Sequence, residues 1–179
     1  KGDLNLVFVG GAGDVDVFSL DSEGNLTPIS NHELYKKKGP ARGMVADNIG
    51  GTDFLFVANK HGNVVETFKI LDNGSLERAA LIEDTEDIHL AVGITLQVIH
   101  MKNASYLFAG GLEKETPGLS AFKINNDGSL THIQSMKDDE KIHTDGIIGM
   151  FVHKIKGKTY LYTSGFQDNG VSSFRIYDN

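Results

Sequence analysis

The chain of 179 residues is long enough for one domain with a sizeable core, and its 40% hydrophobic and 23% charged residues are typical of a globular protein. Its 24 acidic and 17 basic residues give a net charge of −7, which argues against nucleic acid as a partner. Because there is no cysteine, a disulfide framework, a thiol nucleophile and a Cys-ligated zinc are excluded.

No segment is apolar for long enough to predict a membrane span. The most apolar run, 90–99, has about half the length that a transmembrane helix needs. The sequence begins with Lys1 and shows no signal peptide, which predicts a processed or truncated product.

Four related segments follow one another along the chain, beginning near residues 6, 54, 106 and 160. Each contains an apolar run, a polar loop and a second run that includes a phenylalanine. The phenylalanines of successive segments are 50, 54 and 52 residues apart: Phe18, Phe68, Phe122 and Phe174. Six residues after each of the first three there is a glycine, followed by Ser or Asn and then Leu: Gly24, Gly74 and Gly128. This regular spacing predicts a repeat architecture.

Within one period, short apolar or alternating runs predict strands. In the second period these runs are 43–46, 54–57, 64–70 and 76–82, with a hairpin predicted at 72–75. Four short antiparallel strands in a repeat of about 50 residues indicate a β-propeller blade. A helical solenoid is excluded because no window has a sustained 3.6-residue period. A β-sandwich is the structural alternative, although that fold gives no reason for a sequence repeat.

If the strands of a blade are lettered A to D from the propeller axis outward, the chain is predicted to run BCD, ABCD, ABCD, ABC. This is an all-β chain of fourteen strands, about 3.5 blades, or half of a seven-bladed ring. The predicted repeats are 1–41, 42–91, 92–144 and 145–179, within one domain or half-domain. Because such an arc leaves strand edges unpaired, we expect a second propeller half as partner, either an identical chain or the other part of a precursor.

Two segments match the blade pattern of a known group of propellers. Phe54-Leu-Phe-Val-Ala-Asn59, and Tyr160-Leu-Tyr-Thr-Ser164 with Val171-Ser-Ser-Phe174, resemble the YVTN/lactonase-like repeats. A nearer resemblance, through Asp145-Gly146 and Asp168-Asn-Gly-Val-Ser172, is to repeat arrays in secreted proteins of marine bacteria that accompany calcium-binding repeats. The resemblance implies a propeller in a secreted or cell-surface protein. It leaves the activity open, because this fold hosts hydrolases, isomerases, binding modules and structural proteins.

Candidate site residues lie in the predicted connections from a D strand to the next A strand. Two of them, "EDTEDIHLAVGI" and "DDEKIHTDGII", place acidic residues and then Ile-His just before an inner strand. With the corresponding part of the first connection, they bring His89, His143, Asp145 and Arg42 to one rim of the channel. In a propeller this rim, together with the B-to-C loops, forms one face, on which we expect a ligand to bind.

Three interpretations of this rim are open. His89, His143 and Asp145 could hold a divalent metal such as calcium as a cofactor, or the four residues could catalyse the hydrolysis of a lactone or ester. The third, which we favour, is that the repeated Ile-His is blade scaffolding with the imidazole capping a loop carbonyl. The expected function is therefore a binding or structural module for a small molecule or glycan, with a lactonase-like or metal-dependent hydrolase as the alternative. The histidines without an acidic or Gly-rich neighbourhood are assigned no role: His32, His100, His132 and His153.

Overall fold

The computed structural model describes residues 4–37, 39–112 and 118–178. Their fourteen strands form four antiparallel sheets, and the one helical element is a 3-10 turn, η1 (Tyr35–Lys37). The first sheet contains β1 (Asn5–Gly10), β2 (Asp14–Leu20) and β3 (Leu26–Glu33). The second contains β4 (Ala41–Ile49), β5 (Thr52–Asn59), β6 (Val64–Ile70) and β7 (Leu76–Glu83). The third contains β8 (Gly93–His100), β9 (Ser105–Gly111), β10 (Gly118–Ile124) and β11 (Leu130–Lys137). The fourth contains β12 (Ile147–Ile155), β13 (Lys158–Gly165) and β14 (Gly170–Ile176).

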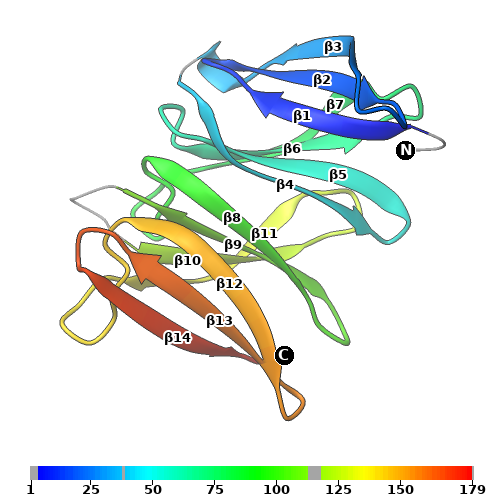
Figure 1. Ribbon diagram of the computed structural model, residues 1–179. Helices are drawn as coiled ribbons and strands as arrows, with labels where there is room; N and C mark the ends of the chain where they lie inside the picture. The colour runs from blue at the N-terminus through cyan, green and yellow to red at the C-terminus, as the bar shows by residue number, and fades with distance from the viewer. Residues whose placement is uncertain (1–3, 38, 113–117, 179) are drawn as a thin grey trace.

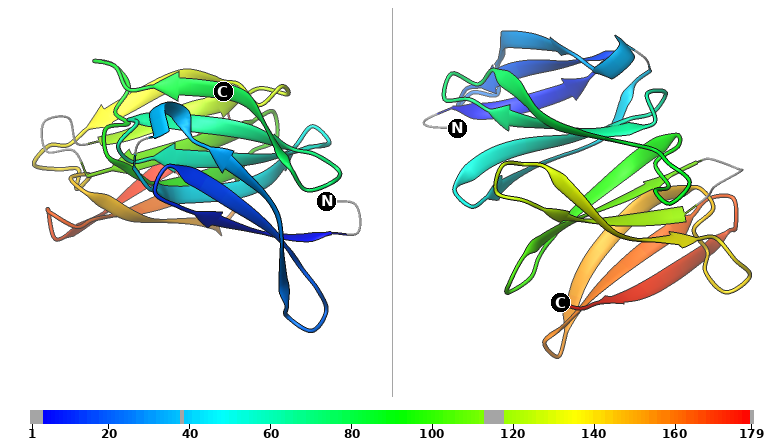
Figure 2. Two further views of the ribbon diagram at one scale, coloured as in Figure 1. Left: turned by 90° about the horizontal axis from the view of Figure 1, so that it is seen from above. Right: turned by 180° about the vertical axis from the view of Figure 1, so that it is seen from behind.

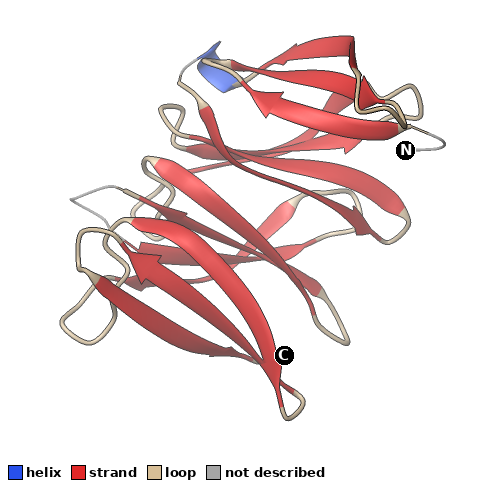
Figure 3. Ribbon diagram, viewed as in Figure 1, coloured by secondary structure: helices blue, strands red, loops and turns tan. Residues whose placement is uncertain are grey.

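The sheets follow one another in chain order as the blades of a partial propeller, here numbered 1 to 4 (Figures 1 and 3). Neighbouring strands in each sheet are neighbours in sequence, so every blade is a meander. Strands β4, β8 and β12 are the A strands, and β3, β7 and β11 are the D strands. The fold class and the strand order BCD, ABCD, ABCD, ABC predicted from the sequence are confirmed. The blades have three, four, four and three strands.

The repeated phenylalanines occupy one register position in all four blades. Phe18, Phe68, Phe122 and Phe174 of the C strands pair with Val7, Leu55, Leu107 and Leu161 of the B strands. Residues at the same offset from this phenylalanine are therefore structurally equivalent, and blades can be compared position by position.

The C–D hairpins share one turn. Gly24, Gly74 and Gly128 have φ values of 89°, 84° and 85°, which only glycine adopts without strain, and each N–H donates to the carbonyl three residues back. Hydrogen bonds from Asn25 lower the pKa of Asp21, and those from Ser129 lower the pKa of Asp127. These carboxylates are therefore occupied with holding the turns.

Three apolar cores lie between neighbouring blades. The core between blades 2 and 3 contains Phe54, Phe56 and Val65 from one side and Leu107 and Phe122 from the other. Equivalent cores join blade 1 to blade 2 and blade 3 to blade 4. A blade therefore buries both faces of its sheet only if another blade packs against each face.

The outer faces of blades 1 and 4 have no such neighbour among the described residues. Val171 on β14 is 69% exposed, whereas the equivalent Val65 and Leu119 are 1% and 3% exposed. On blade 1, Val9 is 43% exposed, whereas the equivalent Val57 is fully buried. We call these surfaces the open flanks. On blade 4 the open flank comprises Phe151, Ile155, Tyr160, Tyr162 and Val171.

The D–A and B–C connections emerge on one side of the molecule, at the left of Figure 1, and the A–B and C–D hairpins emerge on the opposite side. We call these the loop face and the hairpin face; Figure 2 shows the same separation from behind. The inner strands approach one another closely: a Cβ at Gly43 of β4 would lie 2.9 Å from the carbonyl oxygen of Ile94 on β8. This contact brings the starts of the inner strands together at the loop face. Among the described residues no helix is long and apolar enough to cross a membrane.

Candidate functional site

His89 and His143 occupy equivalent places in the D–A connections, four residues before β8 and β12. The backbone N–H of His89 donates to Ser120 Oγ (2.9 Å), and that of His143 donates to Ser172 Oγ (2.8 Å). The serines are equivalent residues of the C strands β10 and β14. In both cases a hydroxyl thus ties the incoming connection to the blade that it is about to enter.

The two imidazole rings lie against glycines at the start of the same C strands. A Cβ at Gly170 would overlap the ring of His143, and one at Gly118 would lie 3.3 Å from the ring of His89. The contacts that recur in the two blades thus run through the histidine backbone and through ring packing on glycine. The carbonyl of His89 accepts a bond from the Ser120 hydroxyl (3.3 Å).

The acidic residues that precede Ile-His in both connections bind backbone N–H groups. Asp84 Oδ1 accepts from the N–H of Leu90 (2.6 Å), and Asp138 Oδ1 accepts from the N–H groups of Thr144 (2.7 Å) and Asp145 (3.1 Å). A carboxylate that accepts backbone bonds in a loop fixes the loop conformation. The repeated pattern of acid followed by Ile-His is therefore explained by loop geometry.

The sequence-predicted site residues lie in three different connections. His143 and Asp145 share the β11–β12 connection, where Asp168 of the β13–β14 loop joins them by accepting from the Asp145 N–H (2.8 Å). His89 lies in the β7–β8 connection, and Arg42 is the second residue of β4. Within the described ranges, no group of three or more His, Asp or Glu side chains is arranged to hold a metal ion.

Blade 2 replaces the serine with a buried carboxylate. Glu66 is equivalent to Ser120 and Ser172, and its side chain is fully buried. Its carboxylate accepts from the Tyr35 N–H (2.8 Å), the Asn59 amide (3.3 Å) and Arg78 Nε (3.0 Å). Arg78 also donates to the carbonyl of Glu33 (2.8 Å). This network joins the end of β3 to blade 2, and Tyr35 takes the place that histidine has in the later connections.

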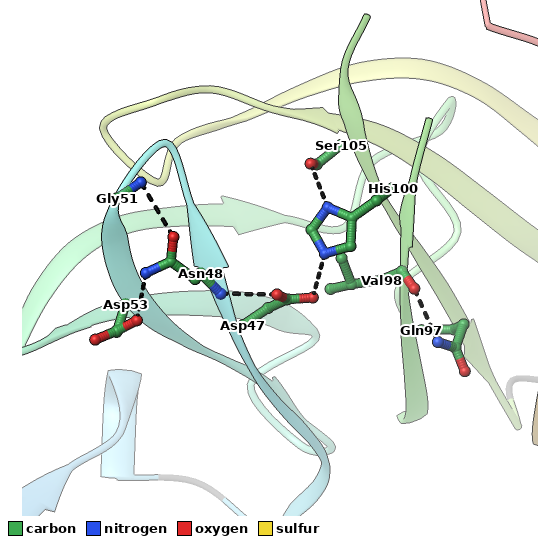
Figure 4. Close-up of polar contacts among 8 residues, drawn as sticks. All are labelled: Asp47, Asn48, Gly51, Asp53, Gln97, Val98, His100 and Ser105. Atoms are coloured by element: carbon green, nitrogen blue, oxygen red, sulfur yellow. Dashed lines mark hydrogen bonds and ion pairs between the residues drawn. The ribbon is translucent and has the colours of Figure 1, made fainter. Parts of the chain in front are cut away.

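A second polar group lies on the hairpin face, between the inner strands of blades 2 and 3 (Figure 4). His100 on β8 bonds Ser105 through Nδ1 (2.8 Å) and the carboxylate of Asp47 on β4 through Nε2 (2.9 Å). This order of carboxylate, imidazole and hydroxyl resembles that of a serine hydrolase. However, the pair His100 and Ser105 occupies the same register position as Asn48 and Asp53, which also bond each other (2.6 Å). The contact between His100 and Ser105 therefore belongs to the repeated cross-strand pairing of the blades.

Sequence reasoning missed both polar groups. Asp47 and His100 are 53 residues apart and come from different repeats. Glu66 lies in β6, where the alternation of apolar and polar residues gives no sign that a carboxylate is buried. The register alignment of the repeats contained one usable signal: blade 2 has Glu66 at the position where blades 3 and 4 have serine.

The starts of the inner strands share one backbone irregularity, but one of the three strands carries a charged residue there. Each of these strands has an irregularity at its second residue, which is Arg42 in β4, Ile94 in β8 and Ile148 in β12. Such an extra residue redirects a side chain away from the sheet. Arg42 is exposed, Ile148 is 52% exposed, and Phe166 of the β13–β14 loop is 65% exposed. At this position blade 2 thus presents arginine, whereas blades 3 and 4 both have isoleucine.

Comparison with known proteins supports the fold. No family model and no curated relative matches the chain. Among solved structures, it is similar to a protein from Lactobacillus plantarum, with a TM-score of 0.57 and 11% identity over 96% of this chain and 54% of that one. It is also similar to a putative 6-phosphogluconolactonase from Bacteroides fragilis (TM-score 0.53, 15% identity, 95% and 65% covered). An exo-β-1,3-galactanase from Phanerochaete chrysosporium gives a TM-score of 0.54 and 12% identity, with 93% and 40% covered. At these identities the likeness is one of fold, and the chain spans less than two thirds of each of these proteins.

Proposed function

We propose that the chain is part of a non-catalytic propeller that binds a small molecule or glycan on its loop face, in a secreted or cell-surface protein of YVTN/lactonase-like ancestry. One observation carries the proposal. Backbone N–H groups in the connections of the loop face are held by Ser120, Ser172, Asp84 and Asp138, while the residue at the start of the inner strand changes from arginine in blade 2 to isoleucine in blades 3 and 4. A rigid, repeated frame with variable exposed side chains is the usual construction of a binding surface.

The chemistry of those side chains favours a ligand with both polar and apolar surfaces. Arg42 offers a cation with several N–H donors, and Phe166 and Ile148 offer exposed apolar area. A sugar ring has hydroxyl groups at its edge and an apolar face of C–H groups, so it suits such a surface. The carboxylates of Asp84 and Asp138 accept hydrogen bonds from backbone N–H groups. They are therefore poorly placed to act as bases or metal ligands for His89 and His143.

The test is a glycan array and a small-molecule thermal-shift screen, run on the unmodified chain and on Arg42→Ala and Phe166→Ala. Binding that falls at least tenfold in either variant supports the loop face. His100→Gln, on the hairpin face, is the matched control and leaves binding unchanged. Turnover of lactones or esters that disappears in His143→Ala or His89→Ala would replace this proposal with the hydrolase, as would a bound metal lost in those variants.

We further propose that a second propeller half packs on the open flanks. The open-flank residues of blade 4 are equivalent to Val45, Ile49, Phe54, Phe56 and Val65, which in blade 2 contribute to the core with blade 3. A neighbouring blade of the same construction would therefore bury them in the same way. The partner is either an identical chain or the other part of a precursor, and the two halves together form a seven-bladed ring.

Native mass spectrometry of the protein isolated from its source tests this assembly. We expect a complex heavier than one chain, which contains either two copies of this chain or this chain and a partner of different sequence. A particle that contains a single copy of this chain and nothing else would contradict it.

A further inference from the structure

A polar groove lies on the hairpin face between blades 2 and 3. It has a volume of about 480 Å³ and is formed by the β4–β5 hairpin of blade 2 and by the β8–β9 and β10–β11 hairpins of blade 3. Its charged side chains are Lys102 and Lys123, and the described residues that line it include no carboxylate. Both blades are four-stranded sheets. The groove is thus a cationic site in a chain whose net charge is −7.

The two lysines of the groove carry charges that no carboxylate neutralises by contact. Both are exposed, and neither forms an ion pair with a carboxylate of the described residues. The carboxylates beside the groove have other partners. Asp127 accepts from the Ser129 N–H (3.0 Å) and hydroxyl (2.6 Å), and Asp178 accepts from the Asn103 N–H (2.9 Å). The ammonium groups are therefore available to an anion from outside the chain.

The equivalent groove between blades 1 and 2 has the opposite charge. It includes Asp53 and Ile70, whose equivalents Ser105 and Ile124 line the groove between blades 2 and 3. The charged side chains of the groove between blades 1 and 2 are those of Asp47 and Asp53. The backbone of the two sites is therefore repeated while their charge is reversed, and the groove between blades 2 and 3 is the one that suits an anion.

The remaining lining of the groove favours a saccharide as the carrier of the anion. Asn103 and Asn126 are exposed, and an amide both donates to and accepts from a hydroxyl group. The volume of about 480 Å³ is in the range of sites for small organic molecules and is far larger than an inorganic anion needs. No aromatic side chain is among the described lining residues, whereas single-stranded nucleic acids bind by stacking their bases on aromatic rings.

We infer that this groove binds an acidic saccharide, one whose sugar units carry carboxylate or sulfate groups. Lys102 and Lys123 bind the anionic groups, and the amides of Asn103 and Asn126 bond the hydroxyl groups. The site lies on the hairpin face, opposite the loop face of the proposed function. The inference therefore goes beyond that function and does not rest on it.

The turns that carry the lysines are held by hydrogen bonds before a ligand arrives. The Met101 N–H donates to the carbonyl of Ala104 (3.0 Å), and the Asn125 N–H donates to the carbonyl of Ser129 (2.9 Å). The side-chain amide of Asn125 also donates to the hydroxyls of Ser129 (2.9 Å) and Thr131 (3.0 Å). Because the backbone is fixed, binding orders only side chains, which lowers its entropic cost.

The test is isothermal titration calorimetry with oligogalacturonate, a chain of carboxylated sugars, in buffer without divalent metal ions. The matched ligand is its methyl ester, in which the same sugar units carry no charge. The titrated proteins are the unmodified chain and a double variant, Lys102→Gln with Lys123→Gln. The matched control protein is Lys60→Gln with Lys141→Gln, which removes two cations from the connections of the loop face. Both double variants change the net charge equally.

We expect saturable binding of the acidic oligosaccharide to the unmodified chain. Affinity falls about tenfold or more for the methyl ester, and by a similar factor in the variant that lacks Lys102 and Lys123, because charge-assisted hydrogen bonds are lost. The control variant binds as the unmodified chain does. Added salt weakens binding to the unmodified chain more than binding to the variant without the groove lysines.

Two competitors distinguish the saccharide from other anions. Inorganic sulfate should displace the oligosaccharide only at concentrations far above those of the oligosaccharide itself, and single-stranded DNA of equal charge should bind more weakly. The inference is overturned if sulfate alone binds as tightly as the oligosaccharide, or if the DNA binds more tightly. It is also overturned if the acid and its methyl ester bind alike, or if the two double variants lose affinity equally.

Discussion

Blade 2 and blade 4 have the same register of residues and different surroundings. In blade 2 the side chains that face the next blade, among them Phe56 and Val65, are buried in a core. In blade 4 the equivalent Tyr162 and Val171 lie on an open flank. The side chains on this face of blades 2 and 4 are thus equally suited to a core. Those of blade 2 contribute more to stability because blade 3 covers them. This comparison gives pairs of matched substitutions.

The largest effect is expected in the core between blades 2 and 3. Phe56→Ala removes a fully buried ring and should lower the free energy of unfolding by about 4 kcal/mol. Tyr162→Ala, at the equivalent position, should lower it by about 1 kcal/mol or less, because its ring lies on the open flank beside Tyr160 and Phe151 and no described blade covers it. Urea unfolding of both variants measures the difference. Equal losses would show that blade 4 is covered in solution.

The next largest loss of stability is expected when the hydrogen bond between a D–A connection and the C strand of the next blade is removed. Glu66→Ala leaves Arg78 without its carboxylate and the Tyr35 N–H without an acceptor, and it should cost about 3 kcal/mol. Ser172→Ala removes one bond to the His143 N–H and should cost about 1 kcal/mol. Urea unfolding again measures both losses. Arg78→Ala should add little in the Glu66→Ala background, and additive losses would contradict the proposed network.

A pH effect is expected where blade 1 meets blade 2. His32 on β3 accepts a bond from the Leu76 N–H (3.0 Å), and burial lowers its pKa from 6.5. The unfolded chain therefore takes up the proton first as the pH falls, so the contribution of His32 is present above pH 6.5 and is lost below it. Urea midpoints measured from pH 8 downward should fall less steeply in His32→Gln than in the unmodified chain. Parallel profiles would contradict this role.

The smallest effect is expected for the exposed pair on the hairpin face. The side chains of His100 and Asp47 are 52% and 24% exposed, so their coupling should be about 0.5 kcal/mol or less and should fall with added salt. A double-mutant cycle with His100→Gln and Asp47→Asn measures it. A coupling of several kcal/mol would indicate a site with a function beyond strand pairing.

Most of the fold was predictable because the repeat presents the same signals several times. The hairpins at Gly24, Gly74 and Gly128 and the phenylalanine register together defined the strands, and the predicted strand 64–70 coincides with β6. The predicted run 43–46 was shorter than β4, because exposed residues such as Asn48 continue the strand without an apolar signal. Strand ends of this kind are decided by pairing with the neighbouring strand.

The candidate site was less predictable, because its contacts join different repeats. Ile-His was recognisable as a repeated element, but its partners Ser120 and Ser172 lie 31 and 29 residues further along the chain. The buried network of Glu66 likewise depends on Tyr35 and Arg78, which no local pattern connects. The roles of His143, Asp145, His89 and Arg42 in binding or catalysis stay predictions.

Hydrogen exchange in the equivalent strands β6, β10 and β14 tests the difference in surroundings between blade 4 and blades 2 and 3 most directly. We predict that the β14 amides exchange much faster than those of β6 and β10 in a chain of these 179 residues, because β14 pairs with one described strand whereas β6 and β10 each pair with two. Protection of β14 equal to that of β6 and β10 in the chain alone would contradict the account.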